Sequence, residues 1–189
     1  MSRVVVLYHS QMGHTEKVAE YIADGLRKRG FVTDLMISGE VPEDFGAGYT
    51  AAVVVGSVHH GHHAEALAEL VKRHRDALRG MITALCSVSI EAAVVEVAET
   101  PVDRGTAEIE LHKPISKFME ATDWLPTLVE PVAGAIPYAH VGPFRRLLLK
   151  RMAGNSHLPT DTTQDHVLTD WEALDRFVET FADKARVMA

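Results

Sequence analysis

The sequence has one cysteine, few aromatic side chains and no apolar run long enough to cross a membrane. The lone Cys86 excludes an intramolecular disulfide and fits a reducing compartment, so we expect a cytoplasmic protein. Basic residues are also scarce: 19 Lys and Arg stand against 26 Asp and Glu, for a formal charge of −7. An acidic chain is a poor general binder of phosphate backbones, which argues against nucleic acid as a partner.

Apolar runs and helical periodicities alternate along the chain. The continuous run from Val4 to Tyr8 is typical of a strand covered on both faces in a parallel sheet. Further strands are predicted at 31–37, 51–57, 81–88 and 127–136, and helices at 18–30, 67–80 and after 169. Thr169 and Glu172 have the spacing of a capping box for the last helix, and Trp171 is expected in its core. The alternation predicts one doubly wound α/β domain over residues 1–189.

One segment, roughly 90–112, interrupts this alternation without a clear period. Its length favours an insertion after the fourth strand, and long loops of this kind are often functional. Between 91 and 112 there are six acids and a single base, Arg104. The acids are Glu91, Glu96, Glu99, Asp103, Glu108 and Glu110.

The first strand ends abruptly in HSQMGHTE, residues 9 to 16. Ser10 and Thr15 offer hydroxyls, Gly13 allows close backbone approach, and a following helix presents unpaired N–H groups. We therefore predict a phosphate cradle formed by Ser10, Gln11, Met12, Gly13, His14 and Thr15. It lacks the lysine of a Walker loop and the three glycines of a dinucleotide fingerprint, which disfavours ATP and NAD. A polar strand-to-helix turn with an ordinary cap is the alternative.

Two further loops follow strands whose carboxyl ends should meet the cradle, because ligands bind at that edge of such sheets. The second loop comprises Ser57, Val58, His59, His60, Gly61 and His62, and the third comprises Ser87, Val88, Ser89 and Ile90. Four imidazoles between 59 and 63 raise the alternative of a metal site, but neither Cys nor carboxylate accompanies them, so no metal is predicted. Solvated histidines and an ordinary strand end remain as alternatives.

The cradle resembles the phosphate loop of flavodoxins, and nearly the whole chain resembles the flavodoxin-like, menaquinone-dependent protoporphyrinogen dehydrogenase family. The resemblance rests on VVVGSVHHGHHAEALAELVKRH, CSVSI, AGAIPYAHVGPFRRLLLKRMAG and TDWEALDRF, in that order. It implies a flavodoxin-like five-stranded parallel sheet in the order 2-1-3-4-5. It also implies FMN held by the three loops, with the second loop beside the isoalloxazine, and a quinone as electron acceptor. His59 and His60 are the candidates for proton transfer, since imidazole titrates near neutral pH.

The resemblance implies protoporphyrinogen as substrate, but the acidic segment disfavours an anionic tetrapyrrole, because like charges repel. In the family this insertion is basic. A flavodoxin-type electron carrier and a binding domain without FMN are the alternative functions, and assembly as a homo-oligomer stays open.

The stretch PFRRLLLKRMAG predicts a short amphipathic helix from Pro143 to Gly154 in which four cations surround apolar side chains. Such a helix could place residues 144–152 on an anionic surface, so peripheral contact with the inner face of the membrane is expected. A helix that packs its leucines on the domain is the alternative.

Overall fold

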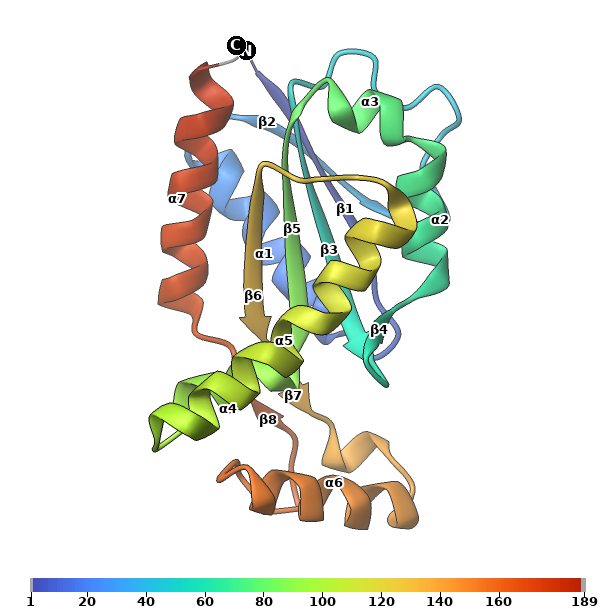
Figure 1. Cartoon of the computed structure of the whole chain (residues 1–189). Coiled ribbons are helices and arrows are strands. Elements are labelled where there is room, and N and C mark those ends of the chain that lie inside the picture. The colour runs from blue at the N-terminus through green and yellow to red at the C-terminus, as the bar shows by residue number, and fades with distance from the viewer. Residues whose placement is uncertain (1, 188–189) are drawn as a thin grey trace.

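The computed structural model describes residues 2–187 and has a central parallel sheet in the order β2-β1-β3-β5-β6 (Figure 1). The five predicted strands and their order are confirmed, because β4 is only a two-residue strand that pairs with the end of β3. The main strands are β1 (Arg3–His9), β2 (Val32–Ile37), β3 (Ala51–His59), β5 (Ile82–Ser89) and β6 (Leu128–Ala133). The short ones are β4 (His62–His63), β7 (Ala135–Ile136) and β8 (His166–Val167).

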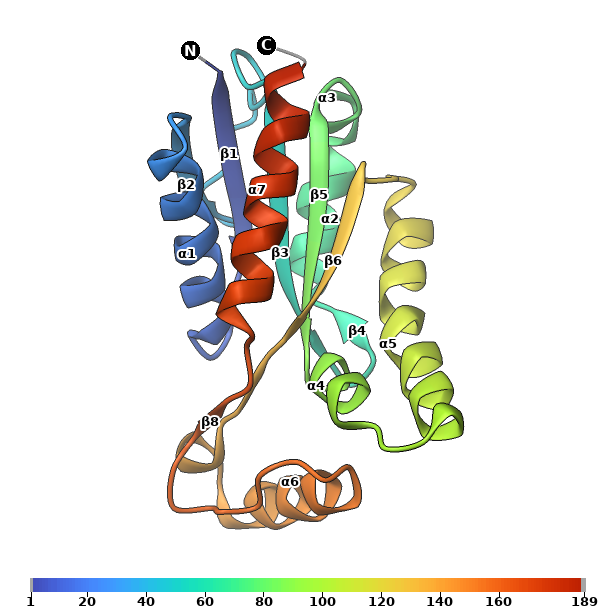
Figure 2. The ribbon, with the colours of Figure 1, turned by 90° about the vertical axis from the view of Figure 1, so that its left-hand side faces the viewer.

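Helices cover both faces of the sheet (Figure 2). One face packs against α1 and α7, and the other against α2, α3 and α5. The helices are α1 (His14–Lys28), α2 (Glu65–Arg73), α3 (Arg75–Arg79), α4 (Ile90–Val97), α5 (Pro101–Thr122), α6 (Pro143–Asn155) and α7 (Trp171–Val187), with a 3₁₀ turn η1 (Tyr138–His140). The central strands read as continuous apolar runs because both of their faces are buried.

Two local expectations about helix ends were wrong. The helix predicted over 67–80 breaks at His74, which separates α2 from α3. The capping box of the last helix is also absent. Asp170, and not Thr169, accepts the first N–H groups of α7, those of Glu172 and Ala173. The Thr169 hydroxyl points into the protein instead and donates to the carbonyl of Ala133. Trp171 packs, half-buried, against the core as expected.

The segment 90–112 is helical and does not form a loop. Ser89 caps α4 and Thr100 caps α5, each accepting from the backbone N–H three residues later. The buried stripe of α5 extends well beyond residue 112, so a window that ends there contains only its first two members. Its residues are Ala107, Leu111, Pro114, Ile115, Phe118 and Thr122.

A small lobe, residues 134–168, projects from the carboxyl edge of the sheet (Figure 2). It contains α6 between β7 and β8, which pair with each other as a two-stranded ladder. Tyr138, Ala153 and Leu158 bury against Ala92 and Ala93 of α4, so the lobe shares a small core with that helix. The fifth strand, predicted over 127–136, stops at Ala133 because the chain leaves the sheet there. The ends of the described chain lie together at the opposite, amino edge of the sheet (Figure 1).

Candidate functional site

The three predicted loops leave the sheet at one level. His9, Gly56 and Ser87 are aligned side by side across β1, β3 and β5. In the sheet, β2 lies on one side of β1 and β3 lies on the other. The order of the strands therefore reverses at β1, and the loops after β1 and β3 flank this switch point. Ligands of doubly wound sheets bind at this place.

The first loop has the geometry of an anion cradle. Gly13 is left-handed, with φ of 82°, and has open space where a Cβ would stand. None of the side chains of residues 2–187 caps α1, which leaves N–H groups of its first turn available. The Ser10 side-chain oxygen accepts from the Gly13 N–H, so its proton is free to be donated outward. Thr15 is a buried residue, and its hydroxyl makes no hydrogen bond among the described residues.

The second loop forms a β-hairpin between β3 and β4. His60 and Gly61 occupy its turn with φ of 53° and 75°, as in a two-residue turn with both central residues left-handed. The His59 Nε2 lies 3.1 Å from the Ser57 hydroxyl. Burial lowers the pKa of His59, and the nearby His60 and Arg145 lower it further. His59 is therefore neutral at pH 7, with Nδ1 directed away from the Ser57 contact.

The third loop offers backbone more than side chains. Ser87 is buried with its hydroxyl 3.3 Å from Nε2 of His63, and the Ser89 hydroxyl caps α4. Val88 is buried, and Ile90 begins α4 half-buried. His63, the last residue of β4, lies edge-on to Phe118 with ring centroids 4.9 Å apart, and burial lowers its pKa to about 4. His63 thus supports the second and third loops as a neutral side chain.

The structure sets His62 and His60 at the exposed hairpin tip and turns His59 and His63 toward serines. Gln11 and Met12 are exposed on the first loop, and His14 is half-buried at the start of α1. Among residues 2–187, no three His, Cys, Asp or Glu side chains are grouped so that they could hold a metal ion.

Gly56 makes the closest packing under the hairpin. A Cβ built there would lie 2.2 Å from Leu67 Cδ2 and 3.1 Å from His63 Nδ1. We expect Gly56→Ala to lower the free energy of unfolding by about 1–3 kcal/mol, the usual cost of overpacking. Urea unfolding measures it, with Gly105→Ala on the open face of α5 as control, because a Cβ there meets no atom within 4 Å. Equal stability of both variants would contradict the packing argument.

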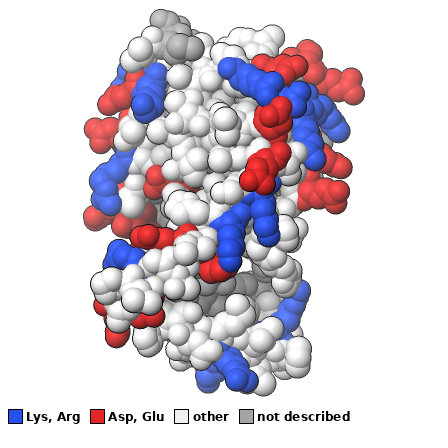
Figure 3. Space-filling view, viewed as in Figure 1, with Lys and Arg blue, Asp and Glu red and all other residues white. Residues whose placement is uncertain are grey.

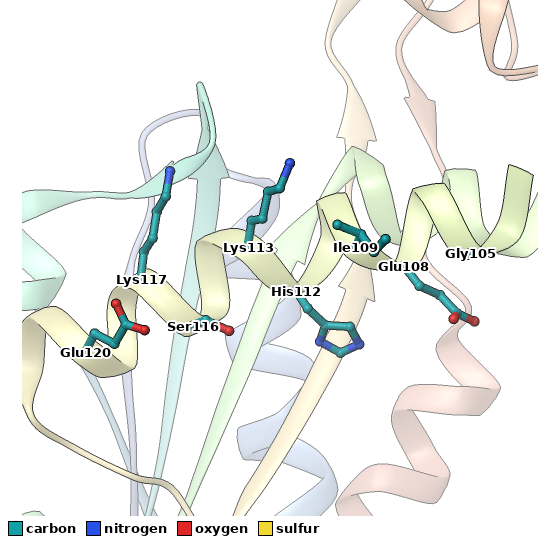
Figure 4. A pocket seen from close by; sticks show the side chains of 8 residues that line it. All are labelled: Gly105, Glu108, Ile109, His112, Lys113, Ser116, Lys117 and Glu120. Atoms are coloured by element: carbon teal, nitrogen blue, oxygen red, sulfur yellow. The ribbon is translucent and has the colours of Figure 1, made fainter.

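A surface hollow of about 580 Å³ lies elsewhere, along α5 (Figure 4). All of its lining residues come from this one helix, so it is a furrow on a helix face and not an enclosed site. Lys113 and Lys117 project from one side of the helix, whereas Glu108 and His112 project from the other (Figure 4).

The sheet order and the phosphate-type turn at its switch point define a flavodoxin-like doubly wound α/β protein. Residues 5–163 match the family model described as a flavodoxin domain. The chain therefore belongs to the flavodoxin domain family.

Comparison with curated proteins narrows the resemblance. The chain is 28% identical over 180 residues to protoporphyrinogen IX dehydrogenase [quinone] of Escherichia coli K12, covering 95% of this chain and 94% of that one. It is 29% identical to the protein of the same name from Leishmania major, covering 95% of this chain and 74% of the relative. Among solved structures, a flavodoxin from Streptococcus pneumoniae superposes with a TM-score of 0.55 at 15% identity, covering 97% and 99% of the two chains.

Proposed function

We propose that this chain is an FMN-dependent oxidoreductase that oxidises protoporphyrinogen IX and uses a quinone as electron acceptor. The observation that carries the proposal is the similarity to proteins of that name along nearly the full length of both chains. The resemblance in sequence implies FMN as the cofactor, and the geometry of the three loops supports FMN binding.

FMN fits the residues present. One phosphate would lie over Gly13, where the uncapped start of α1 and the hydroxyls of Ser10 and Thr15 supply donors and a positive dipole end. The hairpin and the end of β5 would hold the ring through backbone groups, because the hydroxyls of Ser87 and Ser89 are already used within the protein. Bound there, FMN supplies two-electron transfer between substrate and acceptor.

The side chains of the hairpin serve orientation and proton movement in this proposal. In the tautomer whose Nε2–H donates to the Ser57 hydroxyl oxygen, neutral His59 has a free lone pair at Nδ1, which would accept a proton released by the substrate. His60 at the hairpin tip is a second candidate for that role. Both assignments remain predictions.

The acidic segment argued against an anionic substrate, but the charges near the hairpin favour one. The acids of 91–112 stand on α4, on α5 and, for Glu99, in the short connection between the two helices, and most of them are exposed. By contrast, Arg145 of α6 lies near enough to His59 to affect its pKa. A cation across from the hairpin would attract the propionate groups of a porphyrinogen.

The exposed surface of α6 supports peripheral membrane contact. Phe144 and Leu147 are 82% and 67% exposed, and Leu148 and Met152 are also exposed. Basic side chains appear on the lower rim of the lobe in the space-filling view (Figure 3). Lys150 and Arg151 of α6 are exposed, whereas Arg146 binds the carbonyls of Tyr138 and Val141. None of the described helices is long and apolar enough to span a bilayer. We therefore propose that α6 rests on an anionic membrane surface, where a lipid quinone would be within reach.

Turnover tests the proposal directly. FMN-loaded protein with a menaquinone analogue should form fluorescent porphyrin faster than spontaneous oxidation does. Arg145→Gln should raise KM for porphyrinogen about fivefold with little change in kcat, since one partly screened charge contributes ~1 kcal/mol. Arg104→Gln, which removes an exposed cation from α5, is the matched control and should leave KM unchanged. Fluorescence at the spontaneous rate would reject the dehydrogenase and leave an electron carrier.

A further inference from the structure

The lobe is attached to the sheet at a compact root, defined here as Ala133, Gly134, Leu168 and Thr169. The Leu168 N–H donates to the Gly134 carbonyl at 3.0 Å, which closes the two strands that enter and leave the lobe. The Gly134 N–H donates to the Ser89 carbonyl at 2.9 Å, which ties the root to the third loop. The Thr169 hydroxyl donates to the Ala133 carbonyl at 2.6 Å across the same root.

His14 connects this root to the phosphate loop, although 155 positions separate it from its partner in the sequence. Its Nε2 lies 2.8 Å from the Thr169 hydroxyl oxygen. Because that hydroxyl donates its proton to the Ala133 carbonyl, it must accept the hydrogen bond from His14. The Nε2 of His14 therefore carries the hydrogen. The result is a directed chain from the imidazole through the hydroxyl to the root of the lobe.

Packing against Trp171 restricts the His14 imidazole, so it is expected to move only together with the root. Its ring lies edge-on to Trp171, with centroids 6.4 Å apart, and Trp171 in turn packs on Tyr21 of α1 at 4.8 Å. His14 is also the first residue of α1, the helix whose N–H groups border the cradle. A ligand that orders the phosphate loop therefore orders His14, and His14 orders Thr169.

We propose that occupancy of the phosphate loop and the position of the lobe are coupled through His14 and Thr169. His14 is then a positioning residue: it aligns the lobe, and with it Arg145, over the site once the phosphate is in place. This inference rests on the proposed function, because FMN is the ligand that fills the loop. Coupling of this kind is reciprocal, so a lobe fixed in place also favours FMN binding.

Hydrogen exchange of the full-length protein, with and without saturating FMN, tests the coupling. In the wild type, FMN should slow amide exchange across 135–167 by at least about fivefold, the low end of typical couplings between sites. Thr169→Val keeps the branched shape of the side chain but removes the hydroxyl that links His14 to Ala133. FMN should therefore still bind, but it should leave amide exchange in the lobe unchanged. Thr169→Ser should restore the response because it restores the hydroxyl.

Thr180→Val on the exposed side of α7 is the matched control, because its hydroxyl bonds only to the Arg176 carbonyl of the same helix. If circular dichroism finds Thr169→Val unfolded, His14→Phe replaces it, since it keeps a ring against Trp171 but has no donor. If FMN slows exchange in the lobe of Thr169→Val as much as in the wild type, the coupling is overturned. Wild-type protein that binds FMN without any response of the lobe overturns the coupling alone, whereas protein that binds no FMN overturns the proposed function as well.

Discussion

The double variant Ser10→Ala, Thr15→Ala is expected to bind FMN at least about 150-fold more weakly than the wild type, because two hydrogen bonds are lost and each one to a charged phosphate contributes roughly 1.5–3 kcal/mol. Both hydroxyls are available as donors among the described residues. The Ser10 oxygen accepts a hydrogen bond from the Gly13 N–H but its proton is not used, and the Thr15 hydroxyl makes no described hydrogen bond. Flavin fluorescence quenching or calorimetry measures the dissociation constant.

The matched control removes the same groups from helix surfaces outside the cradle, with Ser116→Ala on α5 and Thr180→Ala on α7, both exposed. Their affinity for FMN should equal that of the wild type. If the Ser10, Thr15 variant also keeps full affinity while remaining folded, the phosphate binds somewhere else and the cradle is only a turn.

Membrane association should show the second largest effect. Wild-type protein should co-sediment with anionic vesicles at low salt and be released as ionic strength rises, since the screening length is only ~10 Å at 0.1 M. Replacing Lys150 and Arg151 by Gln should weaken this binding by about 30-fold, because each cation near such a surface contributes ~1 kcal/mol. Arg146 is left in place, since its guanidinium holds two carbonyls of the lobe.

Lys72→Gln with Lys184→Gln provides a control of equal charge, from exposed positions on α2 and α7. It should bind vesicles as the wild type does, which separates a local effect of α6 from the net charge of the protein. Wild-type protein that stays in the supernatant even at low salt would assign the apolar side chains of α6 to some other contact.

The strands were predictable because each central one is buried on both faces, which leaves an uninterrupted apolar run in the sequence. The location of the three loops followed from that, since parallel strands place their carboxyl ends at one edge. The candidate cradle could be proposed from the sequence because its hydroxyls and glycine are adjacent in the chain.

The lobe could not be predicted in the same way. Its strands β7 and β8 have only two residues each, too few for any period to appear, and their partners are far apart in sequence. Thr169 was misread for a related reason: its spacing to Glu172 suits a helix cap, but its actual partners are His14 and Ala133. Only the folded chain brings these groups together.

Both described ends of the chain stand at the amino edge of the sheet, across the whole height of the molecule from the loops and the lobe (Figure 1). An affinity tag or a surface anchor attached at either end would therefore leave the edge with the three loops facing solution. Immobilised on a surface in this orientation, the protein would present the three loops to dissolved small molecules. The nearness of the two ends also suits circular permutation, with new ends opened in the exposed turns at Gly39 or Gly48 and the original ones joined by a short linker.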